Sequence, residues 1–142
     1  MKHKILLTLI VVTMVTGGCE LLDELDPQNS DVRDRITGKW VVDEDSEIFK
    51  KKSAERFYNV TITKDLFDST AFYIDGFYEL DGRVKVIMNS LNLDIPDQTI
   101  SDYIIQDGSG SIAADFKSIT LYYYVDLGIG ERDVVRADYS RP

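Results

Sequence analysis

Cysteine and histidine are almost missing from this 142-residue sequence, which contains one of each. A single cysteine excludes an internal disulfide and a cysteine-based metal cluster. The only histidine, His3, lies in an N-terminal segment that we expect to be removed. Without an imidazole the mature chain has no Ser-His-Asp triad, Cys-His pair or histidine-ligated zinc. We therefore expect no enzyme, and no catalytic residue, metal or cofactor.

Basic residues are also scarce, with 16 Lys and Arg against 25 Asp and Glu. Because the segment to be removed contains Lys2 and Lys4, the formal net charge would change from −9 to −11 on processing. Nucleic-acid binding needs a basic footprint, and the only cluster is Lys50, Lys51 and Lys52. We expect no nucleic-acid partner. A hydrophobic content of 44% is enough for a folded core.

The N-terminus has the pattern of a secretory signal peptide. Lys2, His3 and Lys4 are followed by an apolar run from Ile5 to Val15. This run is too short for a membrane-spanning helix, which needs about 20 residues. A cleavable leader is therefore predicted.

Thr16-Gly17-Gly18-Cys19 resembles the bacterial lipobox, in which small residues precede a cysteine that is acylated and becomes the new N-terminus. Thr16 stands where leucine is most frequent. The resemblance implies a lipoprotein signal peptide over residues 1–18 and acyl chains, palmitate among them, on Cys19. Several chains would hold the protein firmly on a membrane. An ordinary signal peptide with an incidental cysteine is the alternative.

Residues 19–30 are acidic and end in turn-forming residues, which predicts a tether. Their acidic start resembles the surface-export signals of Bacteroidota lipoproteins, although a charged tether without a sorting role has the same composition. We expect a lipid-anchored protein of the cell envelope, on the periplasmic or surface face of the outer membrane.

Residues 31–142 are predicted to form one all-β domain. Ser30 is a candidate cap for a helical turn over 31–36, which Gly38 would end. The segments that follow alternate apolar and polar residues, as half-buried strands do. The candidate strands are residues 40–43, 58–63, 70–77, 83–88, 90–95, 103–106, 118–125 and 133–141.

Turn signals separate these strands. We expect turns at Asp75-Gly76, Asp81-Gly82, Asp107-Gly108 with Gly110, and Gly128 with Gly130. Asp81-Gly82 predicts a short hairpin, and Pro96 should end the strand before it. The segment 45–56 does not alternate cleanly and is a candidate helix. Short strands at this spacing favour an antiparallel barrel of about eight strands, with a β-sandwich as the alternative.

Gly38-Lys39-Trp40, at the start of the first strand, resembles the glycine-x-tryptophan signature of lipocalins and related calycins. In lipocalins an arginine near the end of the last strand stacks over the tryptophan and closes the barrel base. Arg141 has the parity of the inward residues of that strand and is the candidate. The resemblance implies a barrel-base signature of Gly38, Trp40 and Arg141.

Residues 38–142 also resemble the small lipocalin-like domains of Bacteroidota lipoproteins. The resemblance is carried by residues 75–78, 91–98, 108–110 and 134–139. It implies a fold and a location but no activity.

An eight-stranded barrel either fills itself with side chains or holds one small ligand. The predicted inward residues are Trp40, Tyr58, Val60, Ile62, Phe72, Ile74, Val84, Val86, Met88, Leu121, Tyr123 and Val125. Their size favours a filled interior over a ligand cavity.

Two groups of surface residues are weaker candidates for binding. Tyr122 and Tyr124, with Tyr73 beside them, would form an aromatic platform for sugar rings or a protein, or only pack across strands. The acidic groups 43–45 and 94–97 have the oxygen ligands that calcium prefers, but solvated loop carboxylates explain them better.

We therefore expect a lipid-anchored, non-enzymatic binding domain of the cell envelope. Its partner would be a small apolar ligand, a glycan or an envelope protein. The alternative is a structural or assembly component of the envelope, with a filled barrel that acts through its outer surface.

Overall fold

The structure is a computed structural model that describes residues 30–52 and 55–142. The predicted signal peptide, Cys19 and all of the acidic tether except Ser30 lie outside the described residues. The chain divides into two units, Met1–Ser30 and Asp31–Pro142, and all of the described strands belong to the second.

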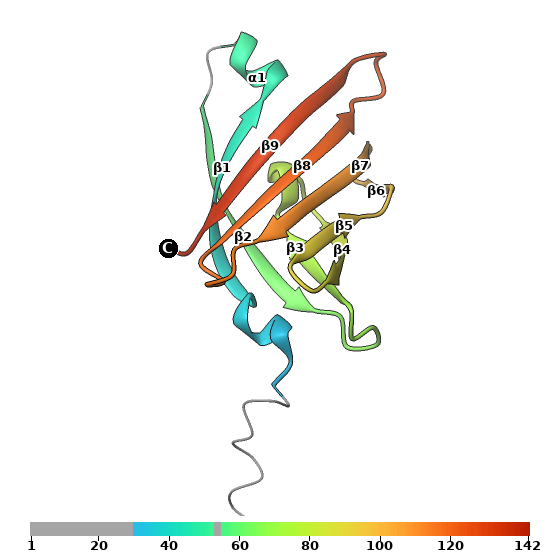
Figure 1. The fold of residues 1–142 in the computed structure, drawn as a ribbon. Helices are drawn as coiled ribbons and strands as arrows, with labels where there is room; N and C mark the ends of the chain where they lie inside the picture. Colours follow the sequence, from blue (N-terminus) through green and yellow to red (C-terminus); the bar gives the residue numbers. More distant parts are fainter. Residues whose placement is uncertain (1–29, 53–54) are drawn as a thin grey trace, which may run out of the picture. The chain divides into compact units, whose positions relative to one another are not determined.

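The described part of the second unit is mostly β-strand (Figure 1). Its strands are β1 (Gly38–Ser46), β2 (Arg56–Lys64), β3 (Ala71–Asp75), β4 (Arg83–Asn89), β5 (Asn92–Ile95), β6 (Gln98–Ile100), β7 (Tyr103–Ile112), β8 (Ser118–Asp126) and β9 (Arg132–Ser140). The helical segments are short: η2 (Val32–Arg35), α1 (Glu47–Lys51) and η3 (Phe77–Glu79). No helix among the described residues combines the length and apolar character needed to cross a membrane.

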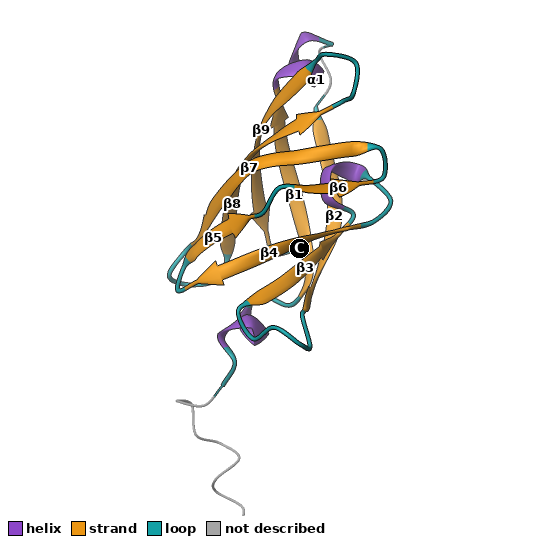
Figure 2. Cartoon of the chain, turned by 90° about the vertical axis from the view of Figure 1, so that its right-hand side faces the viewer, coloured by secondary structure: helices purple, strands orange, loops and turns teal. Residues whose placement is uncertain are grey.

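The strands form one antiparallel sheet in the order β5-β4-β3-β2-β1-β9-β8-β7-β6, and an additional pairing of β5 with β7 closes it. Eight strands therefore make a closed barrel, with β6 as an extra strand beside β7. Figure 2 shows β4 and β5 on the near wall with β1 and β2 behind them. The predicted antiparallel meander that closes into a barrel is confirmed.

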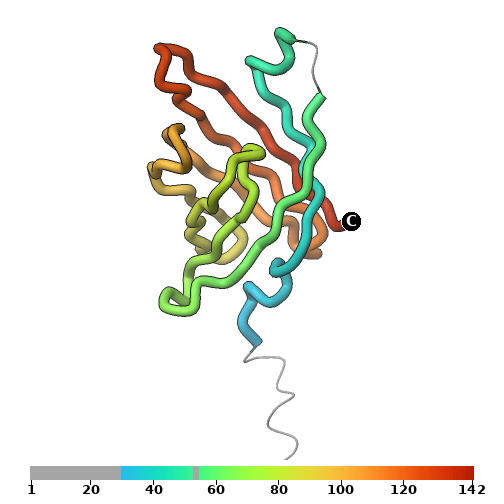
Figure 3. Tube along the Cα trace, turned by 180° about the vertical axis from the view of Figure 1, so that it is seen from behind, coloured from blue at the N-terminus to red at the C-terminus, as the bar shows by residue number. Residues whose placement is uncertain are grey.

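The two ends of the barrel carry different elements. η2 precedes β1 at one end, where the β2–β3 loop also lies, as seen from behind in Figure 3. α1 follows β1 at the other end, which is also the end of the β8–β9 loop (Figure 1). These are the η2 end and the α1 end of the barrel.

Alternation of side chains builds the core as predicted. In β8 the inward residues Ile119, Leu121, Tyr123 and Val125 are all buried. Of the twelve predicted inward residues, only Met88 is half-buried, and the others are buried.

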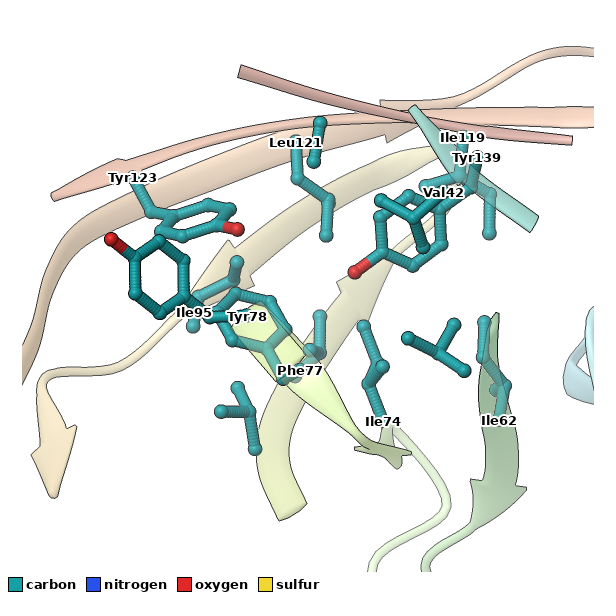
Figure 4. Packing of buried hydrophobic residues seen from close by; sticks show 14 of the residues in the cluster. Val42, Ile62, Ile74, Phe77, Tyr78, Ile95, Ile119, Leu121, Tyr123 and Tyr139 are labelled. Atoms are coloured by element: carbon teal, nitrogen blue, oxygen red, sulfur yellow. The ribbon is translucent and has the colours of Figure 1, made fainter. Parts of the chain in front are cut away.

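The interior is filled by these side chains. The largest of them are at most 2% exposed: Trp40, Phe72, Phe77, Tyr123 and Tyr139. Tyr123 and Tyr139 project from neighbouring strands toward Phe77 and the apolar residues opposite (Figure 4). The ring centroids of Phe77 and Tyr123 are 4.5 Å apart. Because these side chains have almost no area accessible to water, no water-sized space lies beside them.

The predicted turn at residues 107–110 is wrong, because these residues lie inside β7. The pairing of β7 with β8 shifts register between Gln106 and Ser109, so the segment is a β-bulge. A Cβ at Gly108 would lie 2.5 Å from Cβ of Ile95, and one at Gly110 would lie 2.5 Å from the Leu121 side chain. These glycines therefore permit close approach of the neighbouring strands.

The predicted hairpin at Asp81-Gly82 is wrong in length. The β3–β4 connection contains both Gly76 and Gly82, whose backbones are joined by a hydrogen bond of 3.1 Å, and it includes η3. β3 consequently ends at Asp75 instead of Phe77. Left-handed backbone at Gly76 turns the chain so that Phe77 and Tyr78 point into the barrel.

The helical segments η2 and α1 also differ from the prediction. The cap of η2 is Asp31 instead of Ser30, because the Asp31 carboxylate accepts a hydrogen bond of 2.9 Å from the Arg33 amide. The candidate helix over 45–56 is the five-residue α1, flanked by β1 and β2. β5 ends before Pro96 as predicted, and the turn with Gly128 and Gly130 joins β8 to β9.

Candidate functional site

The predicted barrel-base residues meet at the η2 end. The guanidinium carbon of Arg141 lies 4.1 Å from the centroid of the Trp40 ring, and Trp40 is fully buried. Trp40 Nε1 donates a hydrogen bond of 2.7 Å to the Ile36 carbonyl. A Cβ at Gly38 would lie 3.5 Å from Arg141 Nη1. The contact predicted between Trp40 and Arg141 is therefore present, and it covers this end of the barrel.

Arg141 also ties the last strand to η2. Its Nη1 donates a hydrogen bond of 3.0 Å to the Thr37 carbonyl, and its Nη2 donates one of 2.7 Å to the Arg35 carbonyl. Carbonyls at the end of a helical turn lack partners within the turn, so a guanidinium is a favourable donor to them.

A buried polar cluster occupies the α1 end of the barrel. Glu44 of β1 lies at its centre and is 5% exposed. Its Oε1 is 2.7 Å from Nη1 of Arg56 on β2. Its Oε2 accepts a hydrogen bond of 2.8 Å from the Tyr123 hydroxyl and another from the Tyr58 hydroxyl. Every side-chain oxygen of Glu44 is thus engaged from within the barrel.

Arg56 connects this cluster to η3. Its Nη2 donates hydrogen bonds of 2.9 Å to the Tyr78 carbonyl and to Oε2 of Glu79. Its guanidinium carbon also lies 4.1 Å from the ring centroid of Phe49 and 4.4 Å from that of Tyr78. The cation therefore contacts two aromatic rings.

Asp133 of β9 holds a second set of contacts at the same end. Its Oδ2 accepts hydrogen bonds of 2.5 Å from the Ser46 hydroxyl and 2.6 Å from the Tyr78 hydroxyl. Its Oδ1 accepts one of 3.1 Å from the Ile48 amide, so it fixes the start of α1. Asp133 is fully buried.

Burial has the largest effect on the pKa of Glu44 and of the three tyrosines around it. It raises the pKa of Glu44, an effect that hydrogen bonds from Tyr58 and Tyr123 and the charge of Arg56 oppose. Burial likewise raises the pKa of the Tyr58, Tyr78 and Tyr123 hydroxyls above 10, so all three stay protonated and can donate at neutral pH.

The Tyr139 hydroxyl is the exception among the buried phenols described here. It is shielded from solvent and has no hydrogen-bond partner. Two other buried polar atoms of the described residues, Glu44 Oε1 and Arg56 Nη1, also make no hydrogen bond, but they form an ion pair with each other. Burial and the nearby charge of Glu44 raise the pKa of Tyr139. An unpaired buried hydroxyl costs stability, and it lies in the interior beside the polar cluster.

A pocket of about 320 Å³ opens above this cluster. Its lining combines aromatic and aliphatic side chains with two cations and one carboxylate: Ile48, Phe49, Lys52, Arg56, Tyr78, Glu79, Leu80, Tyr103 and Leu127. It is formed by α1, η3, the start of β2, the start of β7 and the residue after β8. Such a mixture of apolar walls and a few fixed polar groups is typical of small-molecule sites.

Of the predicted tyrosine platform, Tyr122 and Tyr124 share the outer face of β8, but Tyr73 does not lie beside them. Tyr122 and Tyr124 lie on β8, where Tyr122 is 51% exposed, but Tyr73 lies on β3. β3 and β8 are four strands apart in both directions around the closed barrel. The guanidinium carbon of Arg132 lies 3.9 Å from the centroid of the Tyr124 ring, and that of Arg136 lies 5.9 Å from the centroid of the Tyr122 ring. Neighbouring side chains therefore cover part of both rings.

The acidic groups do not form a metal site either, since no cluster of metal-ligating residues occurs within 30–52 and 55–142. The expectation that residues 43–45 are solvated loop carboxylates was wrong: all three lie in β1, and Glu44 is buried inside the barrel. The signal was in the sequence: the inward parity of Trp40 and Val42 continues to Glu44 and Ser46, and all four are buried.

No family model matches the sequence, and no curated protein matches it either.

Proposed function

We propose that this protein is a lipid-anchored, non-enzymatic binding protein of the outer membrane with a lipocalin-like barrel. The lipobox-like residues before Cys19 support the anchor, and the closed barrel with Arg141 over Trp40 supports the relationship to lipocalins. The engagement of both Glu44 oxygens supports a structural role for the most deeply buried glutamate instead of a catalytic one.

The pocket at the α1 end is the observation that carries the binding function. Its walls include Phe49, Leu80, Tyr103 and Leu127, which favour a ligand with an apolar body. A volume of about 320 Å³ lies at the lower end of the range for small-molecule sites, so the ligand is small. Sugar rings also stack on aromatic side chains, so a glycan is the second ligand class that the test must include.

Native mass spectrometry of the protein purified from its own envelope tests this function. We expect a retained small molecule in the wild-type protein and its loss in Leu127→Trp, because the larger ring fills the pocket. Ile129→Trp is the matched control, since Ile129 lies in the adjacent β8–β9 loop, is 74% exposed and does not line the pocket.

The lipid anchor is tested on the same preparation. The intact mass of the wild-type protein should equal that of the chain starting at Cys19 plus acyl chains. Cys19→Ser should lack those chains and leave the membrane fraction. An unmodified Cys19 would contradict the anchor.

The filled interior favours a second candidate function, that of an envelope assembly component acting through its outer surface. Trp40, Phe72, Tyr123 and Tyr139 occupy the interior space in which other eight-stranded barrels hold a small ligand. A clean apo mass that persists after incubation with lipid and glycan extracts would favour this candidate over ligand binding.

A further inference from the structure

Two large apolar side chains project into solvent from the β2–β3 loop. Leu66 is 86% exposed and Phe67 is 100% exposed. Both lie on the rim of an outer groove of about 700 Å³ along β2 and β3. Adjacent apolar side chains at a loop tip are costly to keep in water, so such a feature indicates a contact with a partner or a membrane.

The loop is held in this conformation by the side chain of Asp65. Its Oδ1 accepts hydrogen bonds of 2.9 Å from the Phe67 amide and 3.2 Å from the Asp68 amide. Its Oδ2 accepts one of 2.9 Å from the Tyr73 hydroxyl and lies 3.2 Å from Nζ of Lys85. The loop therefore presents Leu66 and Phe67 from a fixed backbone.

Arg33 of η2 binds this loop to the beginning of the domain. Its Nη1 donates hydrogen bonds to two carbonyls of the loop, those of Asp65 (2.9 Å) and Asp68 (2.8 Å), and to that of Ala71 (2.6 Å), where β3 begins. Its Nη2 donates one of 2.7 Å to the carboxylate of Asp31. The exposed apolar tip thus lies at the end of the barrel where the chain enters the domain.

The position of Cys19 in the chain limits how far this end can lie from the anchor. The stretch from Cys19 to Asp31 spans at most about 40 Å when fully extended, at roughly 3.6 Å per residue. The lipid attachment and the apolar tip are therefore joined to the same end of the barrel by a short stretch of chain.

The carboxylates around the apolar tip are paired with cations. Lys64 pairs with Asp34 and, at 3.6 Å, with Asp31. Lys85 lies 3.2 Å from both Asp65 and Asp68. Cations thus neutralise the carboxylates around the tip, which reduces repulsion from a negatively charged lipid surface.

We propose that Leu66 and Phe67 insert into the interfacial layer of the membrane that carries the lipid anchor. The inference rests on the acylation of Cys19 in the proposed function. It fixes the orientation of the barrel: the η2 end faces the lipid, and the pocket at the α1 end opens away from the membrane toward its ligand.

Depth-dependent quenching on the full acylated chain tests the inference. Phe67→Cys and Ile129→Cys each introduce one thiol for an environment-sensitive fluorophore, because an acylated Cys19 no longer has a free thiol. The labelled proteins are placed in vesicles of phosphatidylethanolamine and phosphatidylglycerol that contain spin-labelled lipid. Both positions are exposed apolar loop residues, but Ile129 lies at the α1 end.

We expect the label at position 67 to be quenched several-fold more than the label at 129. Equal quenching at both positions, or none at 67, would overturn the inference. If the intact mass of the same protein shows an acylated Cys19, the proposed lipid anchor would stand even then. An unacylated mass would overturn the anchor itself and this inference with it.

Discussion

The guanidinium of Arg141 lies 4.1 Å from the centre of the buried Trp40 ring, so the residue after the last strand covers the first strand at the base of the barrel. Trp40→Ala should lower the free energy of unfolding by about 3–5 kcal/mol, the usual cost of deleting a buried aromatic side chain. Urea unfolding followed by circular dichroism measures this loss.

Arg141→Ala should cost less, about 1 kcal/mol, because its contact with the ring and its hydrogen bonds to the Thr37 and Arg35 carbonyls are made by an exposed side chain. Arg136→Ala is the matched control, since its guanidinium lies 5.9 Å from the exposed Tyr122 ring. An unchanged unfolding midpoint in Trp40→Ala would remove the physical basis for the barrel-base assignment.

Glu44 and Arg56 form the buried ion pair of the α1 end, and a double-mutant cycle on them measures its coupling. Glu44→Gln removes the buried carboxylate of the pair and leaves the Arg56 guanidinium with the more exposed carboxylate of Glu79, so it should destabilise the protein by about 3–5 kcal/mol. The double variant Glu44→Gln with Arg56→Met should lose less than the sum of the single changes, by about 1–3 kcal/mol.

An exposed ion pair provides the control for this cycle. The Lys50 and Asp45 side chains, 2.7 Å apart, are 68% and 48% exposed, and exposed pairs are worth about 1 kcal/mol or less. Lys50→Met should therefore have little effect. Strict additivity at Glu44 and Arg56 would show that the pair contributes no coupling energy.

Tyr139 and Tyr58 should respond in opposite ways to the loss of a hydroxyl. Tyr139→Phe removes an unpaired buried group and should raise stability by about 1 kcal/mol. Tyr58→Phe removes a donor to Glu44 and should lower stability by about 1–2 kcal/mol. Thermal and urea unfolding of both variants measure the sign. Destabilisation by Tyr139→Phe would indicate that its hydroxyl has a partner in solution.

Alternation of side chains made most of the barrel predictable, because each strand has one face inside and one outside. This prediction failed at two places, β6 and residues 107–110. β6 has three residues, too few to show a period, and was missed. The glycines of 107–110 suggested a turn, but Gly108 and Gly110 are required by the closeness of Ile95 and Leu121 on neighbouring strands.

The α1-end cluster was beyond prediction for a different reason. Glu44, Arg56, Tyr78, Tyr123 and Asp133 come from four strands and η3, and only the closure of the barrel brings them together. Parity alone identifies Glu44 as an inward residue, but it says nothing of its partners. The meeting of Trp40 and Arg141 was predictable because the resemblance to lipocalins supplied the long-range pairing.

The η2 end should make the protein sensitive to acid. Hydrogen bonds from the Phe67 amide, the Tyr73 hydroxyl and Lys85 lower the pKa of Asp65 from 3.8 to about 2, and those from Arg33 lower that of Asp31 to about 2. A carboxyl with a lowered pKa in the folded state stabilises the protein above its ordinary pKa, and this contribution is lost as the pH falls through the lowered value. The melting temperature should therefore drop between about pH 4 and pH 2.

Asp65→Asn isolates this contribution. The variant should melt at a lower temperature than the wild type at pH 7, because an amide binds Lys85 and the loop amides less strongly than a carboxylate does. Its melting temperature should then fall less steeply between about pH 4 and pH 2, since one of the linked carboxyl groups is gone. Asp102→Asn, at an exposed turn position, should retain the wild-type dependence on pH. An Asp65→Asn curve parallel to that of the wild type would show that the carboxylate of Asp65 does not stabilise the loop that carries Leu66 and Phe67.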